Sequence, residues 1–323
     1  MEGTVFVIST ALDLATDRVV DILSQRAVPL LRFNTEDFPY RKCISWQIDT
    51  DKKSCLLDLE RKIHSPKDVR SIWYRRVRSP ASPPGCDEAI HKYVVNEAYG
   101  ALRGMTSAHF SGCRWMSFPA KIEAAEMKPY QLYIAAKLGF PIPPTIISSD
   151  PLAIRDFFFR HEGNVIAKPV RSGYIEVADK AFAIYTRRLS HKDIELLETA
   201  LPCPIIVQKE IPKEVDIRVT VVGRKIFSVA IDSQTDPHAK IDWRRTENPD
   251  LPHQIHELPG RIKNLLIKLT HELGLSFAAI DLVLTPGGKY FFLEVNPSGQ
   301  WLWVEDKTGL PISDAVADWL EGV

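Results

Sequence analysis

Two carboxylates, Asp281 and Glu294, lie on either side of Gly287 and Gly288 in an otherwise apolar stretch. The alternation of side chains and the paired glycines predict a β-hairpin. If the glycines form a two-residue turn, Asp281 lies opposite Glu294, and Asn296 lies two residues farther along the same face. The same register pairs Ile280, Leu282 and Leu284 with Val295, Leu293 and Phe291 on an apolar face.

Directly opposed residues have Cβ atoms about 5 Å apart, so two opposed carboxylates repel each other, and a divalent cation between them would remove the repulsion. Mg²⁺ prefers oxygen ligands and commonly binds one or two carboxylates together with nucleotide phosphates. We therefore predict that Asp281, Glu294 and Asn296 hold Mg²⁺ and a nucleotide. Alternatively, one carboxylate is protonated, or both lie at an exposed sheet rim. A four-residue turn would keep the pairing, whereas a loop of odd length would break it.

Two lysines could meet the phosphates of such a nucleotide. Lys168 lies in the apolar segment "NVIAKPV", where a phosphate oxygen would partner a buried ammonium group. A lysine that reaches solvent from a strand end is the simpler interpretation of this residue taken alone. Lys128 precedes Pro129 at a helix start, where a surface lysine is again the simpler interpretation.

The segment 208–211 ends an apolar strand, and an adenine could lie against it. Asp216 could accept hydrogen bonds from ribose hydroxyls. Arg218 follows two residues later on the same strand face and could brace a phosphate or an acyl phosphate. Taken alone, these charges are more often parts of a solvated strand face. The sequence contains no G-x-x-x-x-G-K-[ST], H-R-D, D-F-G or G-x-S-x-G, which disfavours P-loop ATPases, protein kinases and α/β-hydrolases.

The elements that must position these residues follow from apolar periodicity. Residues 4–9, 14–26 and 28–34 predict a β-α-β opening, without the G-x-G-x-x-G of dinucleotide-binding domains. Further expected elements are a hairpin over 43–60, a strand over 69–78, helices over 88–103 and 129–138, a hairpin over 216–233, and helices over 260–274 and 311–322.

Composition limits the class of protein. A chain of 323 residues favours two or three domains. Lys+Arg 41 balance Asp+Glu 41, which gives no reason to expect a nucleic-acid partner. The five cysteines form no C-x-x-C pair, which favours a reduced, cytoplasmic protein. No signal peptide is evident, and no apolar run approaches the ~20 residues of a membrane span.

Taken in order, the residues resemble the ATP-grasp superfamily, and several phrases are similar to those of the graspetide synthetases, the microviridin-type ligases. These phrases are "SIWYRR", "DIRVTVVG", "AIDSQ", "KIDWRR" and "FLEVNPSGQWLWVE". The resemblance spans essentially the whole chain. It implies an α/β plus α+β protein: an N-terminal pre-ATP-grasp α/β domain over 1–115, and ATP-grasp subdomains over 116–205 and 206–323, the last carrying the metal site.

The resemblance also implies an activity. ATP with Mg²⁺ would activate an Asp or Glu side chain of a ribosomal precursor peptide as an acyl phosphate, and a Thr or Ser hydroxyl or a Lys amine would displace the phosphate. Lys128, Lys168, Gln208, Lys209, Ile211 and Asp216 would bind the nucleotide, and Arg218 and Arg244 would stabilise the reacting oxygens. Arg75, Arg76, Arg244 and Arg245 could attract an acidic core, although for Arg75 and Arg76 a solvated strand end or an interdomain ion pair is an equal alternative. A homodimer is expected.

Two other functions remain open at this point. One is an ATP-grasp ligase that adds amino acids to a protein or peptide. The other is a non-catalytic scaffold that binds a peptide, which the retention of all three proposed metal ligands disfavours.

Overall fold

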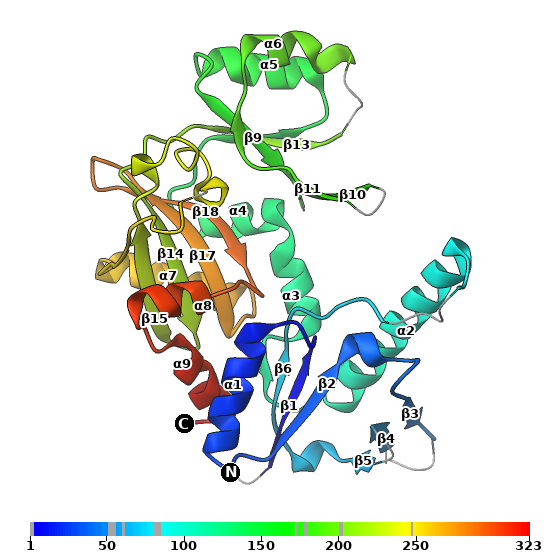
Figure 1. Cartoon of the computed structure of the whole chain (residues 1–323). Coiled ribbons are helices and arrows are strands. Elements are labelled where there is room, and N and C mark those ends of the chain that lie inside the picture. Colours follow the sequence, from blue (N-terminus) through cyan, green and yellow to red (C-terminus); the bar gives the residue numbers. More distant parts are fainter. Residues whose placement is uncertain are drawn as a thin grey trace. The chain divides into compact units, whose positions relative to one another are not determined.

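A computed structural model provides the structure of the chain (Figure 1). It describes residues 3–50, 56–59, 62–80, 85–171, 173–177, 180–199, 203–246 and 248–323. The chain divides into two compact units. The first unit comprises Met1–Ile122, Gly274–Phe277 and Ser298–Val323, and the second comprises Glu123–Leu273 and Ala278–Pro297. Sequence analysis grouped residues 206–323 together, whereas here the last of these residues belong to the same unit as the N-terminus.

The first unit is built on a parallel sheet with the strand order β2-β1-β6-β7. A second, antiparallel sheet has the order β3-β4-β5. The elements of this unit are β1 (Thr4–Ser9), α1 (Leu14–Gln25), β2 (Leu30–Asn34), β3 (Ile44–Gln47), β4 (Leu56–Leu59), β5 (Lys62–His64), β6 (Val69–Tyr74), α2 (Glu88–His109), β7 (Trp115–Met116), α8 (Leu302–Thr308) and α9 (Ile312–Glu321), with α3 (Pro119–Glu126) leading into the second unit.

The β-α-β opening predicted from the sequence is confirmed. In β1, every residue after Thr4 is buried, as expected of an interior strand in a parallel sheet. Helix α1 buries Ala15, Val19 and Leu23 along one face, which explains the helical spacing of its apolar residues.

The C-terminal helix α9 completes this unit by packing against α1 and β6. Ser71 in β6 donates its hydroxyl hydrogen bond to the carbonyl of Leu320 over 2.7 Å. Arg26, at the end of α1, forms ion pairs with Asp314, Asp318 and Glu321. The sequence predicted the helix but not its place beside the first strands.

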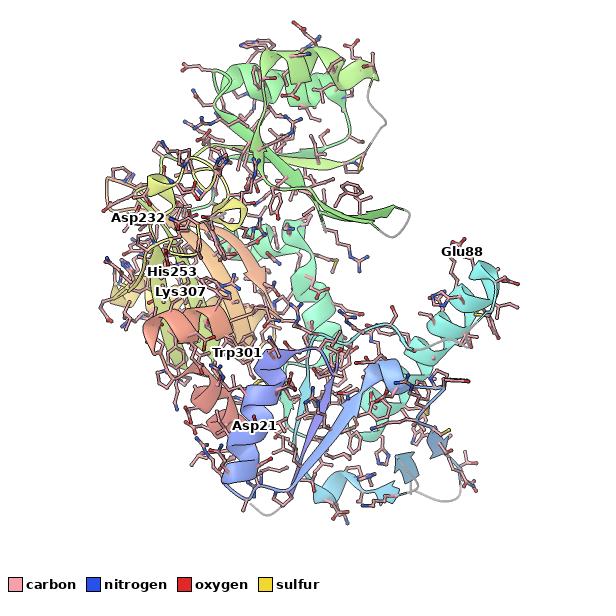
Figure 2. The ribbon with its side chains drawn as sticks, in the orientation of Figure 1. Asp21, Glu88, Asp232, His253, Trp301 and Lys307 are labelled. Carbon is pink, nitrogen blue, oxygen red and sulfur yellow. The ribbon has the colours of Figure 1, made fainter. Side chains whose placement is uncertain are left out.

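Arg75 is buried at the end of β6, with 1% of its surface exposed. Its Nε donates to Asp13 over 2.6 Å, and its other nitrogens donate to Gly299 O and Gln300 Oε1. Its guanidinium lies 4.2 Å from the centre of the Trp301 ring (Trp301 is labelled in Figure 2). The hypotheses of a solvated strand end or a peptide-attracting charge are therefore wrong for Arg75. Its ion pair lies within the first unit.

The second unit contains two larger sheets. One sheet has the order β12-β9-β13-β8, and the other has the order β16-β15-β14-β17-β18. The elements of this unit are α4 (Lys128–Lys137), β8 (Thr145–Ser148), α5 (Pro151–Arg160), β9 (Val165–Pro169), β10 (Tyr174–Val177), β11 (Lys180–Ala183), β12 (Arg187–Arg188), α6 (His191–Leu196), β13 (Ile205–Lys209), β14 (Val215–Val222), β15 (Lys225–Ile231), β16 (His253–Ile255), α7 (Gly260–Glu272), β17 (Phe277–Leu284, whose first residue belongs to the first unit) and β18 (Tyr290–Asn296).

Apolar cores hold these sheets in place. Phe157, Phe158 and Ile194 from α5 and α6 pack with Val165 and Val207 of the first sheet. Helix α7 contacts β14 and α4, and α4 contacts β18. The predicted hairpin of β14 and β15 and the predicted helix α7 are confirmed. The sequence analysis missed α3, α5, α6 and α8.

Helix α2 is longer than predicted and only partly packed. Between Glu88 and Glu97 it buries no side chain, and Glu88 marks its tip in Figure 2. Within the described residues, no helix combines the length and the hydrophobicity needed to cross a bilayer. Cys43, Cys86, Cys113 and Cys203 are free thiols, and Cys55 lies outside the described residues.

Replacing Arg75 with Met keeps most of the side-chain volume but leaves the Asp13 carboxylate, whose side chain is 0% exposed, without its closest counter-charge. We expect the free energy of unfolding to fall by about 3–5 kcal/mol in urea titrations. Arg76→Met is the matched control, because the Arg76 side chain is 44% exposed and lies 3.9 Å from Asp13. It should lose less than about 1 kcal/mol. Equal losses in the two variants would contradict the assignment.

Candidate active site

The predicted pairing of Asp281 with Glu294 is confirmed, but the turn that was expected to produce it is wrong. The hairpin loop contains three residues, Pro286–Gly288, closed by hydrogen bonds from Thr285 N to Lys289 O and from Gly288 N to Thr285 O, each of 2.9 Å. Gly288 has φ +73°, a left-handed conformation that glycine adopts without strain and that commonly ends such a loop.

A β-bulge restores the register that this odd-length loop breaks. Leu282 pairs with Phe292, not with Leu293 as predicted, and the register shifts between Asp281 and Leu282. The extra residue is Leu293, and both Leu293 and Glu294 line the same cavity. A bulge bends a strand and changes the direction of its side chains. Here it brings Glu294 back opposite Asp281.

These carboxylates line a cavity of about 710 Å³, counting its open mouth, within the second unit. Strands of both sheets and the segment 241–244 form its walls. Of the eleven predicted site residues, eight line it: Lys168, Gln208, Lys209, Ile211, Asp216, Arg244, Asp281 and Glu294. Apolar side chains that include Ile166, Val283 and Leu293 complete the walls, so the cavity combines apolar surface with clustered charge.

The two carboxylates have counter-charges that the sequence analysis did not foresee. Arg218 Nη1 donates to both oxygens of Asp281, over 2.9 and 3.1 Å. Glu294 lies 3.5 Å from Arg244 Nη1 and 3.8 Å from Lys128 Nζ. Burial acts to raise the pKa of Glu294, but the nearby cations, led by Lys168 and Arg244, outweigh it and hold the pKa below its usual value. Glu294 is therefore ionised at neutral pH.

Lys168 is a cation of the cavity that lacks a close anion among the residues the structure describes. Within this part of the chain, no carboxylate oxygen lies within 4 Å of Lys168 Nζ, and this ammonium group donates no hydrogen bond. Burial lowers the pKa of Lys168 to about 8, although the charge of Glu294 partly opposes this shift. An ammonium group that is half-buried and has no partner is unfavourable, and an incoming anion would stabilise it.

Arg244 is held at the cavity by a residue to which the sequence analysis gave no role. Its Nε and Nη2 donate to the two oxygens of Asp242 over 2.8 and 2.7 Å. Asp242 is buried, and its Oδ2 also lies 3.3 Å from the backbone N–H of Thr186, which donates to it. The "KIDWRR" phrase could have indicated this ion pair, because Asp242 precedes Arg244 by only two residues.

Asp216 lies deep in the cavity wall. It accepts hydrogen bonds from Lys213 Nζ, over 3.0 and 3.2 Å, and from the Ser233 hydroxyl, over 2.6 Å. Burial raises the pKa of Asp216 in spite of the Lys213 charge. Lys213 also donates to the carbonyl of Ile241, which fixes the segment that carries Arg244. The spacing of Lys213 and Asp216 gave no indication of this link.

Three predicted site residues do not line the cavity. Lys128 donates to the carbonyl of Arg171 over 2.8 Å while it faces Glu294. Arg218 is engaged by Asp281. Asn296 pairs with Ala279 in the ladder and is exposed. The proposed metal ligands are thus two carboxylates at the cavity and one amide outside its walls.

The donor chemistry of the cavity fits a nucleotide and a hard cation. The carboxylates of Asp281 and Glu294 are the oxygen ligands that Mg²⁺ prefers. The ammonium of Lys168 and the guanidinium of Arg244 suit phosphate oxygens. Within the described part of the chain, no three Asp, Glu, His or Cys side chains gather to hold a metal by themselves. A cation here would therefore need ligands from phosphate or water as well.

Comparison with known proteins places this architecture in a family. Residues 4–122 match the family model of the MvdD pre-ATP grasp domain. The macrocyclase MdnB from Microcystis aeruginosa MRC is 31% identical with a TM-score of 0.81, over 98% of this chain and 99% of that chain. The macrocyclase MdnC of the same organism, bound to the precursor peptide MdnA, is 28% identical with a TM-score of 0.85, over 99% of this chain and 100% of that chain.

A third solved structure is a Chryseobacterium gregarium RiPP-associated ATP-grasp ligase in complex with ADP and a leader and core peptide. It is 27% identical with a TM-score of 0.88, over 98% of this chain and 96% of that chain. A search of curated protein sequences found no match. The fold is that of an ATP-grasp ligase. The chain belongs to the RiPP-associated members of that class, the graspetide synthetase family.

The pair of Arg218 and Asp281 provides a test of the charge balance around the cavity. Both side chains are mostly buried, at 8% and 13% exposure. Arg218→Leu should lower the free energy of unfolding by about 3 kcal/mol, because Asp281 loses its closest cation. The double variant with Asp281→Leu should return to within about 1 kcal/mol of the wild type, since apolar side chains of similar volume often replace a buried pair without loss. Urea unfolding measures both, and additive losses would contradict the pairing.

Proposed function

We propose that the protein is an ATP-dependent ligase that crosslinks a ribosomally made precursor peptide. It would activate Asp or Glu side chains of the peptide as acyl phosphates and join them to Thr or Ser hydroxyls or to Lys amines, with release of ADP and phosphate. The observation that carries the proposal is the unpartnered Lys168 ammonium beside the Asp281–Glu294 pair, in a cavity of a chain that belongs to the graspetide synthetase family.

The phosphates of ATP would occupy the charged end of this cavity. Lys168 would bind phosphate oxygens as a point charge, and Lys128 would contribute from beside Glu294. Arg244, oriented by Asp242, would stabilise charge that develops on the transferred phosphoryl group. Asp281 and Glu294 would hold Mg²⁺, which neutralises phosphate charge when bound, with Asn296 as a third ligand.

Arg218 was expected to stabilise the reacting oxygens, but its contact with Asp281 restricts it to a different role. While Arg218 donates to both oxygens of that carboxylate, it orients a proposed metal ligand and does not contact the cavity directly. We propose that this orientation is its main contribution to catalysis.

The substrate would be a peptide with an acidic core. Attraction of that core falls to cations near the cavity, such as Arg244 and Arg245, because Arg75 is buried. MdnC binds the precursor peptide MdnA, and the Chryseobacterium gregarium ligase binds a leader and core peptide; these complexes support a peptide substrate here. A homodimer, also expected for this family, stays a prediction.

The test uses purified protein with ATP, Mg²⁺ and a precursor peptide rich in Thr and Glu. Mass spectrometry should show the loss of one water mass for each crosslink, whereas a gain of residue masses would indicate an amino-acid ligase. Glu294→Gln should lower kcat/KM by roughly 100-fold or more, because the site loses a charged ligand. Glu257→Gln, whose parent side chain is 85% exposed, is the control and should react at the wild-type rate. Turnover by Glu294→Gln at the wild-type rate would refute the metal role.

Nucleotide affinity should depend on pH through Lys168. The pKa of about 8 means that the ammonium is charged below this pH and is lost as the pH rises above it. Phosphates bind the charged form, so the dissociation constant of ADP should rise up to about tenfold for each pH unit above 8. The second phosphate pKa is about 6, so the charge of ADP stays constant in this range. Calorimetry should show this slope for the wild type and a flat profile for Lys168→Arg, which keeps its charge.

A further inference from the structure

The cavity contains a buried hydrogen-bond acceptor without a donor. Gln208 is 0% exposed and lines the cavity from β13. Its Oε1 has no hydrogen-bond partner among the described residues. Leaving a buried acceptor unsatisfied is unfavourable, so such an atom needs an explanation. A ligand that brings a donor to this point would provide one.

The orientation of the Gln208 amide follows from a short chain of hydrogen bonds. Gln208 Nε2 donates to Thr145 Oγ1 over 2.8 Å. Thr145 Oγ1 donates in turn to the carbonyl oxygen of Pro143 over 2.7 Å. A hydroxyl has one hydrogen, and a carbonyl can only accept, so Thr145 has no hydrogen left for Gln208. The opposite amide orientation would place Oε1 against an oxygen that cannot donate. Thr145 therefore leaves the oxygen of the Gln208 amide, and not its nitrogen, as the atom without a partner.

The acceptor lies among apolar residues of the cavity. Gln208 pairs with Ile166 across the ladder of β13 and β9, and Pro143, which also lines the cavity, is the end of the hydrogen-bond chain. Lys168 follows Ile166 by two residues on the same face of β9, at a distance of about 6.6 Å along the strand. Apolar surface from Ile166 and Pro143 therefore lies beside the acceptor, and a cationic side chain lies farther along the same strand face. This order matches a base followed by its phosphates.

We propose that Thr145 is a specificity-determining residue that makes the cavity select adenine nucleotides. It acts as a positioning residue through Gln208. Adenine carries an amine at C6, which would donate to Gln208 Oε1. Hypoxanthine and guanine carry a keto oxygen at C6. This oxygen is also an acceptor, so it could not form a hydrogen bond with Gln208 Oε1. This inference rests on the proposed function, because it requires a purine nucleotide in the cavity.

The test compares ADP with IDP, which differ at C6 and in the proton on the adjacent ring nitrogen, by calorimetry in the presence of Mg²⁺. Wild type should bind ADP more tightly than IDP by roughly 100-fold, as expected when a buried acceptor is left unpaired. Thr145→Val keeps the branched shape but removes the hydroxyl, so the Gln208 amide can turn. The ratio should then fall below about tenfold. Thr145→Ser keeps the hydroxyl and should keep the wild-type ratio.

A second variant separates the two residues. Gln208→Leu removes the acceptor and should also bring the ratio below about tenfold, whether or not Thr145→Val folds. A wild-type ratio in Gln208→Leu, or in a folded Thr145→Val, would overturn the inference while ADP binding still supports the proposed function. Failure of the wild type to bind either nucleotide would overturn both.

Discussion

Charge balance inside the second unit is the constraint on which the site depends. Charges withdrawn from water must be paired, and the pairs here form a connected set: Lys213 with Asp216, Arg218 with Asp281, and Arg244 with Asp242. Glu294 shares two more distant cations, and Lys168 has no close anion. The ion pairs hold the cavity walls in place. The charges of Glu294 and Lys168, which are less closely paired, define where a polyanion with its metal would be stabilised. Structure and binding chemistry therefore come from the same set of residues.

The position of Glu294 within that set results from two irregularities that compensate each other. The three-residue loop at Pro286–Gly288 shifts the ladder by one residue, and the bulge at Leu293 shifts it back. Without the bulge, the strand alternation would direct Glu294 to the apolar face, away from Asp281. The sequence of this hairpin must therefore favour both the three-residue loop and the bulge.

Sequence patterns predicted the parts of this fold that depend on local periodicity. Strand β1, helix α1 and the hairpin of β14 and β15 all follow from apolar spacing. The contacts that patterns could not give are tertiary. Burial of Arg75, the grip of Asp242 on Arg244 and the orientation of Gln208 by Thr145 each join residues whose relation depends on packing or on the local path of the chain. The pairing of Asp281 with Glu294 was predicted correctly, but from a two-residue turn that does not exist, because no simple sequence pattern indicates a β-bulge.

The closure of the first unit by α9 has a consequence for the synthesis of the chain. The hydrogen bonds from Ser71 to the carbonyl of Leu320 and from Arg75 to Gly299 and Gln300 cannot form until those later residues have been synthesised. Domains commonly fold from the N-terminus while the ribosome is still translating, at about 5–20 residues per second. Here the β1–β6 layer emerges first but cannot bury its open side against α9 until residues 312–321 have been translated. The nascent polypeptide therefore leaves that side uncovered for on the order of ten seconds or more after β6 has been made.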